Sequence, residues 1–178
     1  MEKSPLFASL LGDTRYDDKV SSTSIEDFFS EIEYESYGLE VLSQIDPNNL
    51  SEEDQLNYRL LKSDYEISLE GREYPGYYMR LNQRGGVQDY YLYGNRLNFT
   101  DLQSYKNWFE RVKGYTQNVR NSLEINKEGL ELGYTQPKLV TRGVSAQIGA
   151  MLQRDLEDHP YFKIFKNVGD VASPEDAL

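Results

Sequence analysis

Few residues of this chain have side chains that could bind a transition metal or activate a nucleophile. There is no cysteine, and His159, between Asp158 and Pro160, is the single histidine. A helical zinc site needs two imidazoles a turn apart, and a serine nucleophile needs a histidine base beside it. His159 is better explained as the cap at the C-terminal end of a helix than as a metal ligand. We therefore expect no catalytic residue, no metal ligand set and no cofactor within this chain.

Carboxylates are the chemically active groups that remain, and they are abundant. The chain has 30 Asp and Glu residues, with close groups such as Glu31 and Glu35, or Glu52, Glu53 and Asp54. Such groups could bind a hard cation or transfer protons. Among so many acids, however, close pairs arise by chance, and acids in the first turn of a helix are favoured by its dipole. An independent enzyme with a carboxylate-only site is therefore the least favoured hypothesis.

The distribution of charge excludes some partners. Residues 24 to 73 contain 14 acidic and 3 basic side chains, a net charge of -11 that equals the net charge of the whole chain. An acidic field repels phosphate backbones and anionic lipid headgroups, so we expect no nucleic acid as a partner. Residues 1 to 11 carry only a short apolar stretch, too little for a signal peptide or a membrane span. We predict no membrane span, and if the natural protein is exported, its signal is not in this sequence.

Four segments have the apolar spacing of amphipathic helices, and these elements must position any functional residue. The first runs from Ser24 to Ile45 and the second from Ser51 to Glu70, each with an acid three residues after its capping serine. The second segment carries two apolar stripes, Leu56, Leu60 and Ile67 on one face and Tyr58, Leu61, Tyr65 and Leu69 on the other. A helix that is apolar on two faces should lie between neighbouring helices.

The third segment has the clearest pattern. We expect Thr100 to cap it, with Gln103 as the capping-box partner, and we expect it to reach Gly133. Its apolar positions alternate in steps of three and four: Leu102, Tyr105, Phe109, Val112, Thr116, Val119 and Leu123. This spacing predicts a seam for antiparallel packing against other helices. A fourth helix is expected from Pro137 to about Asp158, with Val140, Val144, Ile148, Met151 and Leu152 on one face.

Residues 71 to 99 interrupt the helical pattern. They include six glycine or proline residues and six tyrosines, among them Tyr90 and Tyr91. We expect a long irregular loop, with one short strand possible between Tyr90 and Tyr93. A loop of this length either has a recognition role or is ordered by contacts within the domain, and the sequence leaves both readings open. The predicted fold is all-α: an antiparallel bundle of about four long helices and one Gly/Tyr-rich loop. Residues 1 to 168 are expected to form a single domain, and residues 169 to 178 a tail or linker.

The order of several short motifs is more specific than the composition. They are Leu11-Gly12-Asp13, Arg15-Tyr16-Asp17, Ile45-Asp46-Pro47, Asp54-Gln55-Leu56-Asn57-Tyr58, Asn82-Gln83, Gly85-Gly86-Val87, Tyr105, Trp108, Arg111-Val112, Gly129 to Gly133, Pro137 and Val144 to Gln147. In this order, from about Leu11 to Phe165, they resemble the N-terminal part of a bacterial family of unknown function, numbered 885. Members of that family look like zinc metallopeptidases that are exported or lipid-anchored.

The resemblance implies a helical N-terminal portion that packs against a C-terminal catalytic part of the same polypeptide. The family's zinc motif, His-Glu-x-x-x-Pro-Gly-His-His, lies downstream and has no counterpart here, so zinc is expected in the C-terminal part. The same resemblance implies a periplasmic or lipid-anchored location. The face turned towards the substrate cleft would be the central loop, with the substrate-contact candidates Asn82, Gln83, Arg84, Tyr90 and Tyr91.

Two functions from different classes remain open at this stage. The first is a non-catalytic fragment of a metallopeptidase-like protein, which predicts exposed apolar surface where the other part docks. Candidates for that surface are Met79, Leu81, Val87, Leu92 and the Phe162 to Phe165 segment. The second is a stand-alone helical module that binds a peptide or protein through the tyrosine-rich loop, with a closed surface elsewhere.

Overall fold

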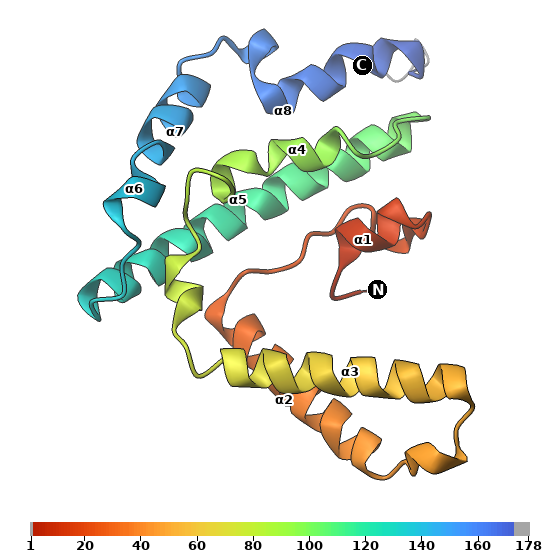
Figure 1. Ribbon diagram of the computed structural model, residues 1–178. Coiled ribbons are helices and arrows are strands. Elements are labelled where there is room, and N and C mark those ends of the chain that lie inside the picture. The colour runs from red at the N-terminus through yellow and green to blue at the C-terminus, as the bar shows by residue number, and fades with distance from the viewer. Residues whose placement is uncertain (1, 173–178) are drawn as a thin grey trace.

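The computed structural model describes residues 2–172, and the regular elements in that range are all helices, with no β-strand (Figure 1). The α-helices are α1 (Pro5–Leu10), α2 (Ile25–Ser43), α3 (Glu52–Gly71), α4 (Tyr91–Gly94), α5 (Leu102–Glu131), α6 (Lys138–Thr141), α7 (Val144–Leu152) and α8 (Pro160–Lys163). Short 3-10 helices connect them: η1 (Thr14–Tyr16), η2 (Pro47–Asn49), η3 (Gly76–Met79), η4 (Val87–Asp89), η5 (Leu156–Asp158) and η6 (Ile164–Asp170). The predicted all-α class is confirmed.

The first two long helices begin where the sequence indicates. The side chain of Ser24 accepts a hydrogen bond from the backbone N–H of Asp27, and Ser51 does the same for Asp54. A capping oxygen satisfies one of the N–H groups that have no partner in the first turn of a helix. The residue type and its spacing therefore set these two helix starts.

The start of α5 differs by one residue from the expectation. Asp101, not Thr100, is the cap: its carboxylate accepts from the Ser104 N–H, and Ser104 closes a capping box that Gln103 was expected to close. At the other end, Gly133 adopts the left-handed conformation with φ 85°, as expected of a residue just after a helix. The 30 residues of α5 make it the longest helix of the described chain.

The bundle of four long helices is not confirmed. The expected fourth helix is two short ones, α6 and α7, because the chain turns at Arg142 and Gly143. The segment 71–99 is also more regular than expected, since it contains η3, η4 and α4. The prediction that a short strand could form between Tyr90 and Tyr93 was wrong, because Tyr91 to Gly94 form the helix α4. The ring of Tyr93 lies 6.0 Å from that of Tyr115 on α5, and the ring of Tyr91 lies 6.1 Å from that of Tyr161 on α8, between centroids.

The core is aromatic and lies along one side of α5. Trp108 is 1% exposed, and its ring centroid lies 5.9 Å from that of Tyr115 and 6.5 Å from that of Tyr161. Gly94 of α4 approaches closely, because a Cβ there would lie 2.8 Å from the Trp108 ring. Large aromatic side chains bury much apolar area per residue, so the short helices around Trp108 can pack on the long helix α5.

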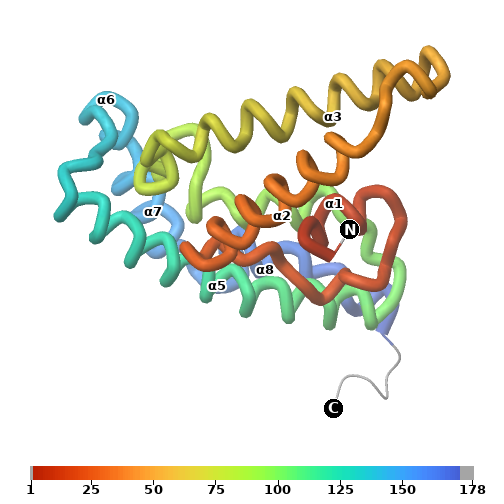
Figure 2. Tube along the Cα trace, turned by 90° about the horizontal axis from the view of Figure 1, so that it is seen from below, coloured from red at the N-terminus to blue at the C-terminus, as the bar shows by residue number. Residues whose placement is uncertain are grey.

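The helices α2 and α3 form a hairpin that projects from the rest of the molecule, and we call residues 25–71 the arm. Figures 1 and 2 both show the end of this hairpin, between α2 and α3, standing clear of the other helices. Figure 2 also shows α5 with α7 and α8 beyond it, and we call residues 76–172 the body. Within the arm, α3 packs against α2 and η2. The prediction that α3 lies between neighbouring helices on two faces is therefore not confirmed.

The C-terminal boundary is only partly described. The η6 helix reaches Asp170, and residues 173–178 of the expected tail lie outside the described residues. The boundary at residue 168 therefore stays a prediction. Among the described helices, none combines the length and the apolar character needed to cross a bilayer.

Candidate functional site

The candidate loop begins with a tight turn. Asn82 and Gly85 form an isolated antiparallel bridge, and the Asn82 side-chain carbonyl accepts a hydrogen bond from the Arg84 N–H at 2.9 Å. An Asn that bonds the backbone two residues on stabilises such a turn. The side chains of Gln83 and Arg84 are exposed at its tip. Three of the five candidate residues are thus gathered on one exposed turn.

Two glutamine side chains hold this turn against α6 and α7. Gln88, which is 4% exposed, donates from Nε2 to the Asn82 carbonyl at 2.8 Å. Gln147 of α7 donates from Nε2 to the Gln83 carbonyl at 3.0 Å, and the Gln83 N–H donates to the Val140 carbonyl at 2.9 Å. A buried amide that bonds backbone groups on both sides fixes a loop without a regular ladder. Nothing in the spacing of Gln88 or Gln147 indicated this role.

The other two candidates, Tyr90 and Tyr91, point into the aromatic core. The Tyr90 ring centroid lies 4.8 Å from that of Tyr115 on α5, and the Tyr91 centroid lies 6.1 Å from that of Tyr161. Burial raises the pKa of the Tyr90 hydroxyl, and also that of Tyr115 and Tyr161. These phenols therefore stay protonated at neutral pH and act as hydrogen-bonding groups rather than as bases.

A hollow of about 280 Å³ lies beside Tyr91, between η4 and α7. Its lining includes Gln88, Asp89, Tyr91, Gln147, Met151 and Arg154. A carboxylate, a guanidinium and two amides around one hollow are groups that can pair with the N–H and C=O groups of a peptide. The Gln88 Oε1 atom is buried without a hydrogen-bond partner in the described chain. Tyr90 does not line this hollow; it borders a separate one of about 50 Å³ with Arg80 and Asn126.

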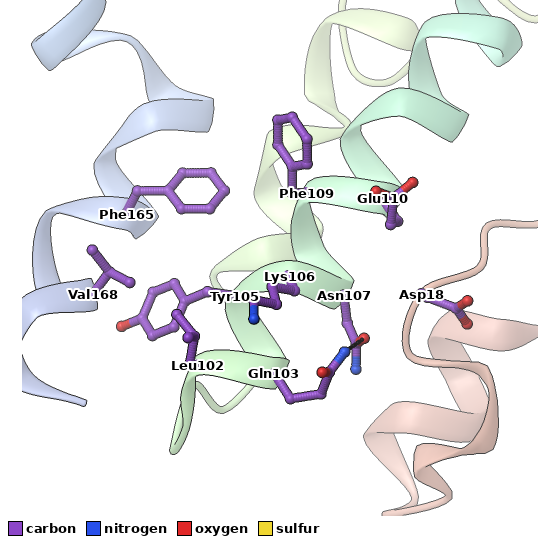
Figure 3. Close-up of a pocket in the computed structure, with 10 residues that line it drawn as sticks. All are labelled: Asp18, Leu102, Gln103, Tyr105, Lys106, Asn107, Phe109, Glu110, Phe165 and Val168. Atoms are coloured by element: carbon purple, nitrogen blue, oxygen red, sulfur yellow. Dashed lines mark hydrogen bonds between the residues drawn. The ribbon is translucent and has the colours of Figure 1, made fainter. Parts of the chain in front are cut away.

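A larger hollow of about 540 Å³ lies at the N-terminal end of α5, and Figure 3 shows its lining residues. The rings of Phe109 on α5 and Phe165 on η6 face each other across it, with Leu102 and Val168 below them. Lys106, Glu110 and Asp18 are the charged residues at its edge. The site is mainly apolar and offers no group that the sequence singled out for chemistry.

Arg111 is a polar residue whose role the sequence did not reveal. Its side chain is 1% exposed, and its Nη2 donates to the Ser9 hydroxyl at 2.6 Å and the Tyr16 carbonyl at 3.0 Å. Asp17 lies 3.8 Å from the same nitrogen and supplies the opposite charge. Burial lowers the pKa of this guanidinium, because water no longer solvates the charge. Arg111 thereby ties the N-terminal segment to α5, which is a structural role.

The residues of this chain do not fit a zinc site. No group of three or more His, Cys, Asp or Glu side chains is arranged to hold a metal ion anywhere in residues 2–172. His159, which was expected to cap the C-terminal end of a helix, is the C-terminal cap residue of η5, and its ring stacks on Tyr161 with ring centroids 5.8 Å apart. We derive no reaction step through zinc in this chain.

Comparison with known proteins gives one match. The family described as "Bacterial protein of unknown function (DUF885)" matches residues 5–177, which is nearly the whole chain. Comparisons with curated proteins and with solved structures found no match. The predicted resemblance is thus confirmed at the level of the family, and the roles of the candidate residues stay predictions.

Proposed function

Because this chain belongs to the bacterial protein family of unknown function DUF885, we propose that it is the non-catalytic, helical N-terminal portion of a zinc metallopeptidase-like protein. In this proposal it packs against a C-terminal catalytic part and helps to wall the substrate cleft. The partner is the rest of the same polypeptide, and that other part holds the zinc ion. The location would be the periplasm or a lipid-anchored site on the cell surface.

The observation that carries this proposal is the uncovered seam of α5. Its apolar residues recur at three and four residues, and although Tyr105 is buried, Phe109 is 51% exposed, Val119 41% and Leu123 53%. A stripe with this spacing normally packs against another helix. The expected apolar docking residues of the central loop are mostly half-buried instead, and only Leu92 among them is exposed. The seam of α5 is therefore the better candidate for the face that meets the catalytic part.

The central loop supports the second half of the proposal. Asn82, Gln83 and Arg84 present polar side chains at an exposed turn, and Tyr91 borders a hollow lined by amides and charges. A substrate peptide has unpaired backbone donors and acceptors that such groups can satisfy. The buried Gln88 and the exposed Gln147 both bond the backbone of this loop and hold it in one conformation, which lowers the entropic cost of binding.

The test is the mass of the natural gene product in its own cells, detected with an antibody raised against this chain. We expect a band far heavier than the 20.7 kDa of the chain, and zinc that co-purifies with the heavier product. A single band at 20.7 kDa would contradict the proposal. That result would favour the second function, a stand-alone module that binds a peptide at the hollow beside Tyr91.

A further inference from the structure

The arm carries an apolar face that no other described helix covers. On α3, Leu56 is 50% exposed, Leu60 60% and Ile67 65%. These residues lie within about 40° of one another around the helix and extend for about 16 Å along it. Ser63 occupies the same stripe between Leu60 and Ile67 and is exposed as well. The stripe thus has the length of a short helix-docking surface.

The opposite face of α3 already has its partner. Tyr58 donates from its hydroxyl to the Leu42 carbonyl of α2 at 3.3 Å. The Tyr65 ring packs on Gly38, where an added Cβ would lie 2.5 Å from it. The arm is fixed to the rest of the molecule at its base, where the Phe28 and Tyr77 rings lie 4.6 Å apart. The uncovered stripe is therefore a second apolar face of α3, separate from the face that packs against α2.

The charges beside the stripe are almost all negative. Helix geometry places Glu53 and Asp64 along one edge and Glu70 along the other, with Arg59 as the nearest base. The only ion pair with both partners on α3 joins Lys62 to Glu66 at 3.8 Å, so it neutralises none of the three acids named above. Coulomb repulsion disfavours nucleic acids and anionic membranes at this face. The complementary ligand is an amphipathic helix with an apolar stripe and flanking Lys or Arg side chains.

We infer that the outer face of α3 is a docking site for a basic amphipathic helix supplied by a partner protein. This inference goes beyond the proposed function, because it concerns a different surface. The seam of α5, at which the rest of the polypeptide is proposed to pack, belongs to the body, whereas α3 lies on the projecting arm (Figures 1 and 2). The α5 seam also carries bases, with Lys106 and Arg120 beside it, whereas Lys113 and Lys127 there pair with Glu110 and Glu124 of the same helix.

The test uses the 178-residue chain and a fluorescent synthetic helix of about three heptads, with Leu at a and d and Lys at e and g. A second peptide of the same length carries Glu in place of Lys. Fluorescence anisotropy should show that the Lys peptide binds at least about tenfold more tightly. Its affinity should fall as salt is raised from about 0.01 M to about 0.15 M. Equal binding of the two peptides, or no binding of either, would overturn the inference.

Variants of the chain locate the contact. Leu60→Lys should weaken binding of the Lys peptide at least about tenfold, because it removes an apolar contact and adds a like charge. Leu139→Lys is the matched control, since Leu139 is similarly exposed at 65% but lies on α6, outside both the arm and the α5 seam; its affinity should be unchanged. Circular dichroism of both variants checks that the helices are retained. Equal loss in both variants would contradict a site on α3.

Two further measurements distinguish other occupants of the stripe. Sedimentation of the chain alone should give a monomer, and a dimer that Leu60→Lys dissolves would assign the stripe to a second copy. If the natural product is heavier than this chain, it should bind the Lys peptide as well. Failure of the heavier product to bind would mean that its own polypeptide covers the stripe, which would overturn the inference but leave the proposed function intact.

Discussion

At the scale of single residues, Arg111 shows how a polar side chain can organise an apolar core. Its guanidinium bonds atoms that are about a hundred residues away in the chain, from Pro5, Ser9 and Tyr16. These acceptors give hydrogen-bond partners to one nitrogen of a charged side chain that is buried away from water. In a sequence, an arginine on a helix is normally interpreted as a solvated charge. Only the folded structure shows that Arg111 joins the N-terminal segment to α5.

Replacing Arg111 should therefore destabilise the chain without changing its charge pattern elsewhere. We expect Arg111→Met to lower the free energy of unfolding by about 3 kcal/mol, because Ser9, Tyr16 and Asp17 lose their common partner. Urea denaturation followed by circular dichroism measures this change. The control is Arg120→Met, an exposed position on the same helix, which should change the free energy by less than about 0.5 kcal/mol. Similar effects of the two substitutions would show that Arg111 is no anchor.

The candidate site shows the same limit of sequence reasoning. The turn at Asn82 to Gly85 could be anticipated, because Asn and Gly are turn residues. The contacts of Gln88 and Gln147 could not, since glutamine carries little conformational preference and the two residues are 59 positions apart. The division of Tyr90 and Tyr91 between two hollows depends on which way a four-residue helix is turned.

At the scale of helices, the ends of the long elements were well predicted and their interruptions were not. Ser24 and Ser51 cap as expected because each side chain meets an orphan N–H in its own first turn, which is a local event. The expected fourth helix fails at Arg142 and Gly143, where the apolar spacing continues but the backbone turns. At that point Gln83 of the loop bonds the Val140 carbonyl, and the Gln83 side chain lies against Gly143. A tertiary contact thus overrides a local pattern.

Helix capping can be tested directly at the start of α5. Thr100 and Asp101 are adjacent and both are capping residue types, but only Asp101 accepts the Ser104 N–H, at 2.8 Å. We expect Asp101→Ala to cost about 1 kcal/mol of unfolding free energy and Thr100→Ala much less. Thermal or urea denaturation of the two variants makes the comparison. A larger effect of Thr100→Ala would return the helix start to the residue that the sequence first indicated.

At the scale of the whole molecule, the arm and the body should differ in local stability. The buried residues of α5 include Trp108, Tyr115 and Ile125, whereas α3 has no buried residue. Amide hydrogen exchange should therefore be markedly faster in the middle of α3 than in the middle of α5, because opening a helix with few buried contacts costs less. Exchange measured by mass spectrometry on peptides from 56–67 and 108–125 tests this. Equal protection of both segments would mean that the arm unfolds only with the body.

The overall arrangement was the least predictable level. The spacing of α3 correctly indicated two apolar stripes, and the spacing of α5 correctly indicated a seam. Both patterns indicate that a helix face packs against an apolar partner. Neither pattern indicates whether that partner lies in the same chain. Bundle packing was inferred by assuming that the four helices satisfy one another. In the structure α3 satisfies one face on α2 and leaves the other open, so the expected bundle does not close.

The position of Trp108 gives this chain a built-in optical reporter. The only tryptophan lies within 6.5 Å, ring centroid to ring centroid, of Tyr115, Tyr161 and Phe99. At such separations, ultraviolet light absorbed by tyrosine is passed to the indole, which then emits in its place. The folded chain should consequently show tryptophan emission excited through these tyrosines, and the tyrosine emission of this cluster should rise when the cluster comes apart. Docking of α8 and η6 on α5 can thus be followed in real time without attaching any dye.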